Sequence, residues 1–368
     1  MAHGELPPLN ITPGAIRFNT DSMKLEYFRI GMEGGSTSSY AGIGTLAAGE
    51  WVQLTTTSPE VQTGGTRALL VGGYNPGSDT YLDEIVYINV ATTGNSLSFG
   101  ELTVSDRNHV HSCTSDRTRG ISAGGSKFPG AFTSDIEFVT IASTGNAIDF
   151  GGDLTLARYS AAVASNGTRG LFAGGQSPAA TQTVNIDYIT IQSTGVAAID
   201  FGDLTSARRY IMASFSSSTR GIFAGGVGPG ATDDIDFITM STQGNAAHFG
   251  NLTTAGSSAH GSSITSNSIR GIIMGGTTPT ATNTIDYLTI ATLGDAQEFG
   301  ELTATAGAHA GAAASSTRCV RMGQGHPAYN NTIEYVQIMT LGNSIDFGDL
   351  NTQPTGYSAG LSNGHGGL

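Results

Sequence analysis

The sequence predicts an all-β protein built from six copies of one unit. An arginine followed by small and apolar residues and then by a glycine recurs about every 50 residues, a period typical of solenoids and propellers. This arginine stands at Arg67, Arg119, Arg169, Arg220, Arg270 and Arg318, and a leucine that ends each unit stands at Leu102, Leu154, Leu204, Leu252, Leu302 and Leu350. The apolar runs between these marks are short and bounded by Gly, Asn, Ser and Pro, and none has helical periodicity.

The unit over residues 158–202 shows its elements in order. A run of small apolar residues ends at Asn166-Gly167, a pair suited to a tight turn. The next run is apolar throughout, as expected for a central strand that is covered on both faces. A Gly pair, a loop, a β-branched run and a Ser-Thr-Gly turn follow, so the pattern indicates an antiparallel meander. Its four strands are expected at residues 159–165, 170–173, 186–191 and 197–201.

Six four-stranded sheets can cover each other's faces when they pack around an axis, which predicts a six-bladed β-propeller over residues 66–368. The first unit has no convincing first strand, because residues 61–65 are poor strand formers. Residues 357–364 resemble an inner first strand. We therefore expect the C-terminal strand to complete blade one and to remove the open sheet edges.

Composition limits the classes of partner. Lys plus Arg number 16 and Asp plus Glu 29, so the net charge is −13, while Gly contributes 53 residues. An acidic chain without a basic stripe repels phosphate backbones, which argues against nucleic acid. No signal peptide or membrane-spanning run is recognisable, so we expect a soluble protein made in a cytoplasm. Cys113 and Cys319 occupy non-equivalent positions and are expected to be small buried residues rather than a disulfide.

Residues 1–65 do not match the repeat and form a second expected unit. Residues 13–21 and 24–28 alternate like a hairpin, and residues 50–54 suggest a third strand. Three strands are too few to be stable alone, so this unit should dock on something. We expect it to dock on another subunit of a particle, the alternative being its own propeller. The candidate docking residues are Ile16, Phe18, Leu25, Tyr27 and Trp51.

Two resemblances follow from these residues. The double glycine Gly174-Gly175, the apolar residues before it and the later Ile186-Asp187-Tyr188 resemble the kelch repeat, with Phe replacing the usual Trp of the fourth strand. The Ser/Thr/Gly-rich repeats are similar to those of kelch-like virion proteins of tailed bacteriophages. Residues 16–21 with Leu25-Glu26-Tyr27 and Trp51 also resemble a short segment of phage tail fibres and appendages. These resemblances imply a virion location, other virion subunits as partners and a homo-oligomer.

The loops after the double glycines lie on one face of the predicted ring and differ between blades. Blades three to five carry mainly Ala, Gly and Thr there, whereas blades six, one and two, which closure makes neighbours, carry aromatic residues. Exposed aromatic side chains on one sector predict a contact surface for a protein or a sugar, unless they pack within their own loops. The candidates are Tyr74, Tyr81, Lys127, Phe128, Phe132, His326 and Tyr329.

Other polar positions favour structural roles. His109, His111, His260, His309 and His365 are expected on inner strands, facing channel water, without the carboxylate or cysteine partners of a metal site. The acids Glu137, Asp187, Asp236, Asp286 and Glu334 recur once per blade, with Val86 in blade one. Repetition separates them in space, so hydrogen bonds between blades are expected rather than the paired carboxylates of a glycosidase.

No nucleophile elbow, phosphate loop or sialidase box is present, so we expect no catalytic residues and no cofactor. The leading hypothesis is a non-enzymatic structural protein of a tailed-phage virion, such as a tail fibre, nozzle or other appendage. Its loop face would contact a host-surface glycan or protein. The alternatives are a free-standing kelch-like adaptor or lectin and, less favoured, a glycan hydrolase, because fold alone does not decide function.

Overall fold

The computed structural model describes residues 15–19, 24–30 and 49–53 of the N-terminal part and, of residues 66–368, all but 104–106, 110–111, 128–130, 179–180, 257–262, 278–279, 308–309, 326 and 352–355. Its contacts divide the chain into two compact units, Met1–Ser58 and Pro59–Leu368. Among the described residues, no helix is long and apolar enough to cross a membrane.

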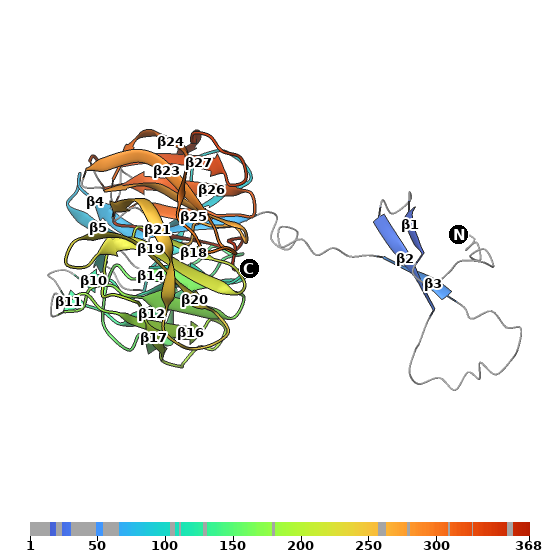
Figure 1. The fold of residues 1–368 in the computed structure, drawn as a ribbon, viewed down its shortest axis with the longest axis horizontal. Helices are drawn as coiled ribbons and strands as arrows, with labels where there is room; N and C mark the ends of the chain where they lie inside the picture. Colours follow the sequence, from blue (N-terminus) through green and yellow to red (C-terminus); the bar gives the residue numbers. More distant parts are fainter. Residues whose placement is uncertain are drawn as a thin grey trace, which may run out of the picture. The chain divides into compact units, whose positions relative to one another are not determined.

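The N-terminal unit contains an antiparallel sheet in the order β1-β2-β3 (Figure 1). Its strands are β1 (Ile16–Asn19), β2 (Lys24–Ile30) and β3 (Gly49–Gln53). The hairpin and the third strand expected from the sequence are confirmed, with Phe18 opposite Leu25 and Phe28 opposite Trp51.

The second unit is a six-bladed β-propeller. Blade 3 holds β14 (Ala162–Ser165), β15 (Arg169–Ala173), β16 (Asn185–Thr190) and β17 (Ile199–Asp203), paired antiparallel in that order. The other blades follow the same inner-to-outer order. Blade 1 holds β29 (Ala359–Ser362), β4 (Arg67–Asn75), β5 (Thr80–Asn89) and β6 (Leu97–Glu101), and blade 2 holds β8 (Ser112–Ser115), β9 (Arg119–Ala123), β12 (Asp135–Thr140) and β13 (Ile148–Asp153). Blade 4 holds β18 (Ala213–Ser216), β19 (Arg220–Val227), β20 (Ala231–Thr239) and β21 (Ala247–Gly256); blade 5 holds β22 (Arg270–Thr277), β23 (Ala281–Thr289) and β24 (Gln297–Ala306); and blade 6 holds β25 (Gly311–Ala314), β26 (Arg318–Gln324), β27 (Asn330–Gln337) and β28 (Ile345–Asp349).

Two blades depart from this plan. The described residues of blade 5 include no continuous inner strand: Ser266 forms a single bridge to Gly271 of β22, and Ile264 forms a single bridge to Ser214 of blade 4. Blade 2 carries an additional small sheet of β7 (Arg107–His109), β10 (Ser126–Lys127) and β11 (Ala131–Phe132). The sequence repeat did not indicate this second feature, because residues 107–109 interrupt the pattern of the other blades.

The hydrophobic core lies between adjacent blades. Leu171 packs with residues of blade 4, whereas the next residue, Phe172, packs with residues of blade 2. Successive side chains of a strand point to opposite faces, so a strand covered on both sides is apolar at every position. This confirms the expectation for residues 170–173 and explains why no blade could be stable alone.

Closure of the ring joins the two ends of the repeat. Strand β29 pairs with β4 from Ala359 opposite Val71 to Ser362 opposite Ala68, as the sequence predicted. The Asn363 side chain then accepts a hydrogen bond of 2.8 Å from the Arg67 amide, 296 positions away. Residues of blades 1 and 6 accordingly share one core cluster, in which Leu70 of β4 packs with Val320 and Met322 of β26.

The repeated arginine ties each blade to the next. Its Nη1 donates to a main-chain carbonyl at the end of the third strand of the following blade, at 2.8 to 3.4 Å. The guanidinium lies 4.5 to 5.1 Å over the aromatic ring of its own third strand, and that ring meets the fourth-strand Phe edge to face. The carbonyl acceptors are Ile141, Ile191, Met240, Ile290, Ile338 and Val90. Because Arg318 of blade 6 reaches Val90 of blade 1, the ring of contacts is complete.

A second ring runs along the outer strands. The glycine of each turn between the third and fourth strands donates its amide to the carbonyl of the fourth-strand Phe of the preceding blade, as Gly94 does to Phe347 at 2.8 Å. The glycine after that Phe is required by the close approach. A Cβ at Gly348, whose φ is 148°, would lie 2.5 Å from the Gly94 oxygen.

A third ring surrounds the axis and is capped by the C-terminal residues. Ser115, Ser165, Ser266 and Ser362 each donate a side-chain hydrogen bond to a carbonyl of the neighbouring inner strand, at 2.5 to 3.0 Å. Gly366 and Gly367 enter this ring so closely that a Cβ would lie 2.0 Å from the Asn267 oxygen and 1.8 Å from the Ser165 oxygen, respectively. The tail therefore occupies the axis at the level of these serines.

His365 fixes the tail within the ring. Its Nε2 lies 3.1 Å from the Ser115 carbonyl oxygen, which can only accept, so Nε2 carries the proton. Its Nδ1 then accepts from the Gly367 amide at 3.1 Å. The expectation that this histidine faces channel water is wrong, because its side chain is 2% exposed. Burial lowers the pKa of His365 to about 4, although the Ser115 carbonyl and Asp116 favour protonation.

Replacement of the repeated arginine by lysine should weaken the propeller. The planar guanidinium of arginine lies over the aromatic ring and at the same time donates a hydrogen bond to the carbonyl of the next blade, and the lysine ammonium lacks this shape. Arg119→Lys is therefore expected to lower the free energy of unfolding by about 1–2 kcal/mol. Urea unfolding measures this change. The control is Arg117→Lys, since Arg117 is exposed two residues earlier; an equal loss in both variants would contradict the role assigned to Arg119.

The buried neutral His365 should make stability depend on pH. Unfolded histidine takes up a proton near pH 6.5 and folded His365 only near pH 4, so between these values the unfolded state binds more protons. Stability should therefore fall as the pH decreases from about 6.5 to 4, by about 3 kcal/mol in total from this group. Urea unfolding across this range should show a smaller slope for His365→Asn than for the parent, whereas replacing the exposed His248 should leave the slope unchanged.

Candidate binding face

The double glycines place the loops of one face. In blade 3, Gly174 and Gly175 have φ values of 63° and 102°, in the region that favours glycine. A Cβ at Gly174 would lie 2.6 Å from the Arg208 oxygen, so the segment that leads to the next blade can pass directly over the pair. The loops between the second and third strands and the segments that enter the inner strands therefore share this face of the ring.

A cluster of four tyrosines lies on this face where blades 6 and 1 meet. The Tyr74 ring centroid is 5.1 Å from that of Tyr81, 5.8 Å from that of Tyr329 and 6.4 Å from that of Tyr357. All four side chains are partly exposed. The Tyr74 hydroxyl donates a hydrogen bond of 2.7 Å to Asp79, which raises the pKa of Tyr74, and burial raises the pKa of Tyr329. Tyr74 and Tyr329 therefore stay neutral, and the cluster presents ring faces and hydroxyl groups.

The structure brings together three of the seven residues that the sequence suggested as a contact surface. Tyr74, Tyr81 and Tyr329 join the tyrosine cluster, while Phe132 lies elsewhere. Lys127 is on β10, but its side chain, together with Phe128 and His326, lies outside the described residues. Sequence reasoning missed Tyr357, because it was counted as part of the closing strand. The available signal was that this strand, once paired with the second strand of blade 1, places its first residues beside Tyr74.

Phe132 belongs to a second aromatic group on blades 2 to 4. Its ring centroid is 4.9 Å from that of Tyr159, which in turn is 5.9 Å from that of Tyr210. The two tyrosine hydroxyls lie 3.0 Å apart, and burial raises the pKa of Tyr159. Tyr159 is buried, whereas Phe132 and Tyr210 are partly exposed. The tyrosine cluster at blades 6 and 1, whose four side chains are all partly exposed, is therefore the more accessible of the two.

The candidate docking residues of the N-terminal unit lie on its three strands. Ile16 is 64% exposed and pairs with Tyr27, which is partly exposed. Phe18 pairs with Leu25, and Trp51 pairs with Phe28, but the side chains of Phe18, Leu25 and Trp51 lie outside the described residues. Docking on another subunit stays a prediction.

The repeated acids form hydrogen bonds between blades, as expected from the sequence. Each accepts from the threonine that follows the unit-ending leucine of the preceding blade, as Asp187 does from the Thr155 amide at 3.1 Å and from its hydroxyl at 2.7 Å. The same contact joins Thr103 to Glu137, Thr205 to Asp236, Thr253 to Asp286 and Thr303 to Glu334. Blade 1 has Val86 at this position, and there Asn351 and Ser96 form the bond between blades 6 and 1 instead.

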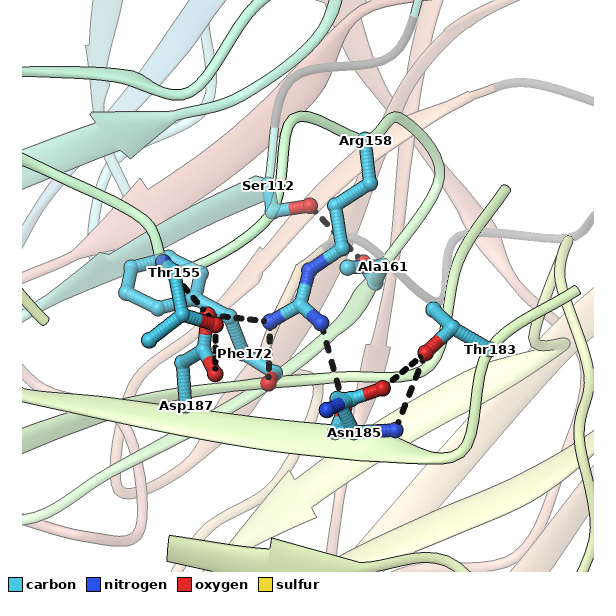
Figure 2. A network of polar contacts seen from close by, with 8 residues as sticks. All are labelled: Ser112, Thr155, Arg158, Ala161, Phe172, Thr183, Asn185 and Asp187. Carbon is cyan, nitrogen blue, oxygen red and sulfur yellow. Dashed lines mark hydrogen bonds and ion pairs between the residues drawn. The ribbon is translucent and has the colours of Figure 1, made fainter. Parts of the chain in front are cut away.

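Two of these acids are also paired with fully buried arginines. Figure 2 shows the guanidinium of Arg158 pointing at the carboxylate of Asp187, 3.0 Å away. Thr155 contacts the same carboxylate. Arg158 also donates to the carbonyls of Phe172 at 3.0 Å and Asn185 at 3.2 Å. Burial lowers the pKa of Arg158, and Asp187 opposes this shift. The charges neutralise each other, so this network has a structural role.

Blade 4 repeats this pair and blade 6 rearranges it. Arg208 lies 2.7 Å from Asp236 and donates to the carbonyls of Asp234 and Phe223. In blade 6 the guanidinium comes from the second strand, where Arg321 lies 4.0 Å from Glu334. Burial lowers the pKa of Arg321 to about 10. The sequence analysis did not single out these three arginines, although the common Ala-Arg of residues 157–158 and 207–208 was a visible signal.

The remaining candidates do not assemble a reactive site in the described part of the chain. No group of three or more His, Cys, Asp or Glu side chains that could hold a metal ion occurs among the described residues. The expectation that His109 lies on an inner strand is wrong, because it lies on β7 of the additional small sheet, whereas the inner strand of blade 2 is β8. The side chain of His109 is outside the described residues, as are His111, His260 and His309. Cys113 and Cys319 are buried in different core clusters, as predicted.

Comparison with known proteins adds no relative. No family model matches the chain, and no curated protein matches it.

Removal of the carboxylate of a buried ion pair should lower the stability of the propeller. Asp187→Asn leaves the Arg158 charge buried without a counter-ion, so the free energy of unfolding is expected to fall by about 3–5 kcal/mol. The matched control is Asp200→Asn, because Asp200 lies directly opposite Asp187 on β17 and is exposed. Chemical denaturation measures both variants, and a similar small change in each would show that the pair is not needed.

Proposed function

We propose that this protein is a non-enzymatic attachment protein on the exterior of a tailed-phage particle, in which the loop face of the propeller binds a receptor on the host surface. The tyrosine cluster of Tyr74, Tyr81, Tyr329 and Tyr357 is the observation that carries the binding role. The phage setting rests on the resemblance of the repeats and of the N-terminal segment to phage virion proteins.

The tyrosine cluster has the properties of a binding surface. Tyrosine offers a large apolar ring with a polar tip, and few rotatable bonds are frozen when a ligand covers it. Aromatic residues are enriched where proteins contact partners, and charged residues are depleted there. The ring of Tyr74 and the three partly exposed rings around it can cover the C–H face of a sugar, while their hydroxyls and Asp79 offer hydrogen bonds.

The N-terminal unit supports attachment to a larger assembly. It is a compact unit of its own with a three-stranded sheet, which is a small basis for independent stability. Ile16, 64% exposed on β1, leaves an apolar side chain for a partner. The net charge of −13 limits unspecific adhesion to anionic surfaces.

The use of the repeated carboxylates favours binding over hydrolysis. Asp187 and Asp236 are each saturated by a threonine and a buried arginine, and no two of the repeated acids share a blade. The alternatives are a free-standing kelch-like adaptor or lectin and a glycan hydrolase. Neighbouring genes for portal, tail or capsid proteins would distinguish the virion protein from the adaptor, and turnover of a host polysaccharide by the purified protein would identify the hydrolase.

The double variant Tyr74→Ala/Tyr329→Ala tests the binding face. Loss of two central aromatic rings should weaken binding to host cells or to their isolated surface glycans by about 10- to 100-fold. Glycan arrays and titration of labelled protein on host cells measure this change. Leu341→Ala is the control, because Leu341 is 56% exposed in the turn between the third and fourth strands of blade 6, on the opposite face.

Binding that is unchanged in the tyrosine double variant, with a thermal unfolding curve like the parent's, would overturn the assignment of this face. Loss of binding after removal of protein from the host cells, but not after removal of glycans, would identify a protein receptor.

A further inference from the structure

Blade 5 keeps the carboxylate of the buried ion pairs but lacks the arginine. Asp286 is 7% exposed and accepts a hydrogen bond from the Thr253 hydroxyl through Oδ2, whereas its buried Oδ1 has no hydrogen-bond partner among the described residues. The described residues include no ion pair to Asp286. In blades 3 and 4 the corresponding carboxylates of Asp187 and Asp236 each receive a guanidinium.

The missing arginine is replaced by Gly256. A Cβ on the first glycine of each pair would meet the carbonyl oxygen of the residue at this position: Arg158 at 2.5 Å from Gly124, Arg208 at 2.6 Å from Gly174 and Gly256 at 2.9 Å from Gly225. Gly256 therefore occupies the main-chain position of the two arginines. The second strand offers no substitute of the kind seen in blade 6, because Ile273 stands opposite Asp286 where Arg321 stands opposite Glu334.

A pocket lies at Asp286, the residue that corresponds to the carboxylates that receive a guanidinium in blades 3 and 4. It is lined by Asp286 and Gly275, by Met212 and by four threonines, and its free volume is about 30 Å³. Its threonines are Thr253, Thr254, Thr282 and Thr284. Thr254 is exposed and Thr282 is partly exposed, so the pocket opens to solvent. It is large enough for a water and polar enough to hold one, and its open side leaves room for the stem of a larger ligand.

We propose that this pocket of blade 5 binds a guanidinium group from outside the chain, with its N–H donors directed at Asp286 Oδ1. The group would take the place that the Arg158 and Arg208 side chains have in their blades. Those arginines also donate to the carbonyls opposite and two residues before their aspartate, which in blade 5 correspond to Ile273 and Thr284. The ligand is a free guanidinium compound or an arginine side chain of another protein, since both present the same planar fork.

Charge supports this assignment. Burial raises the pKa of Asp286, the Thr253 hydrogen bond lowers it, and Glu298 adds a further unfavourable negative charge. A cation in the pocket would compensate the buried carboxylate, as the arginines do in blades 3 and 4. A divalent metal ion fits less well, because Asp286 is the one carboxylate among the lining residues and calcium takes six to eight oxygen ligands.

Titration with guanidinium chloride at low millimolar concentrations, against sodium chloride at equal ionic strength, tests the proposal. Chemical shifts in two-dimensional NMR or the thermal midpoint should change saturably, with half-saturation at about millimolar concentration for so small a group. N-acetyl-arginine amide, used in parallel, distinguishes a protein side chain from the free ion. N-acetyl-lysine amide should bind at least about tenfold more weakly, because an ammonium cannot donate in a planar fork.

Two variants make the result specific to the pocket. Asp286→Asn removes the charge and should weaken guanidinium binding by about tenfold or more. Gly256→Arg should abolish binding because its own side chain fills the site. Asp346→Asn, which neutralises an exposed carboxylate of blade 6, should bind like the parent.

A parent protein that shows no saturable response, or a response that Asp286→Asn and Gly256→Arg leave unchanged, would overturn the proposal. If one of the two variants does not fold, the other still decides. The result is independent of the tyrosine cluster, since Tyr74→Ala/Tyr329→Ala should bind guanidinium normally whether or not it binds a host receptor.

Discussion

The hydrogen bond from one blade to the next is the constraint on which the structure depends. No blade on its own can bury both of its faces, and each third strand ends in a carbonyl that the arginine of the preceding blade satisfies, as Arg220 does for Ile290. The arginine in turn needs the aromatic ring beneath it, and that ring needs the fourth-strand Phe. A single repeated side chain thereby connects backbone, core and neighbouring blade. Stability is shared around the ring rather than held within a blade.

This constraint separates two kinds of position. The repeated arginine, the hydrogen bond from threonine to the repeated acid and the fourth-strand Phe are used in the same way in every blade that has them, so they carry architecture. Function is expected where the blades differ, since a difference leaves the frame intact. The tyrosines around Tyr74 and the glycine at Gly256 are both such differences. The tyrosines add aromatic side chains to the loop face, and the glycine removes the arginine side chain from a buried ion pair.

Much of the fold could be predicted from the sequence because the repeat is also the unit of packing. Residues 170–173 are apolar at each position because blades lie on both sides, and β29 completes blade 1, as the poor strand-forming sequence of residues 61–65 suggested. The buried pair of Arg158 and Asp187 was less accessible to such reasoning. Its members are 29 positions apart in sequence and meet only after the loop has folded back over the double glycine. Gly256 stands where the other two copies have Arg158 and Arg208, but this difference has a meaning only once the aspartate that pairs with those arginines is known.

Closure by β29 has a consequence for how the chain is made. Blade 1 cannot acquire its inner strand until Ala359–Ser362 have left the ribosome, so the inner edge of β4 stays open while the five other blades are made. Such distant pairing is slow and leaves a nascent chain open to association with its neighbours. The yield of active protein should therefore be governed by the time between the synthesis of the first blade and that of its last strand.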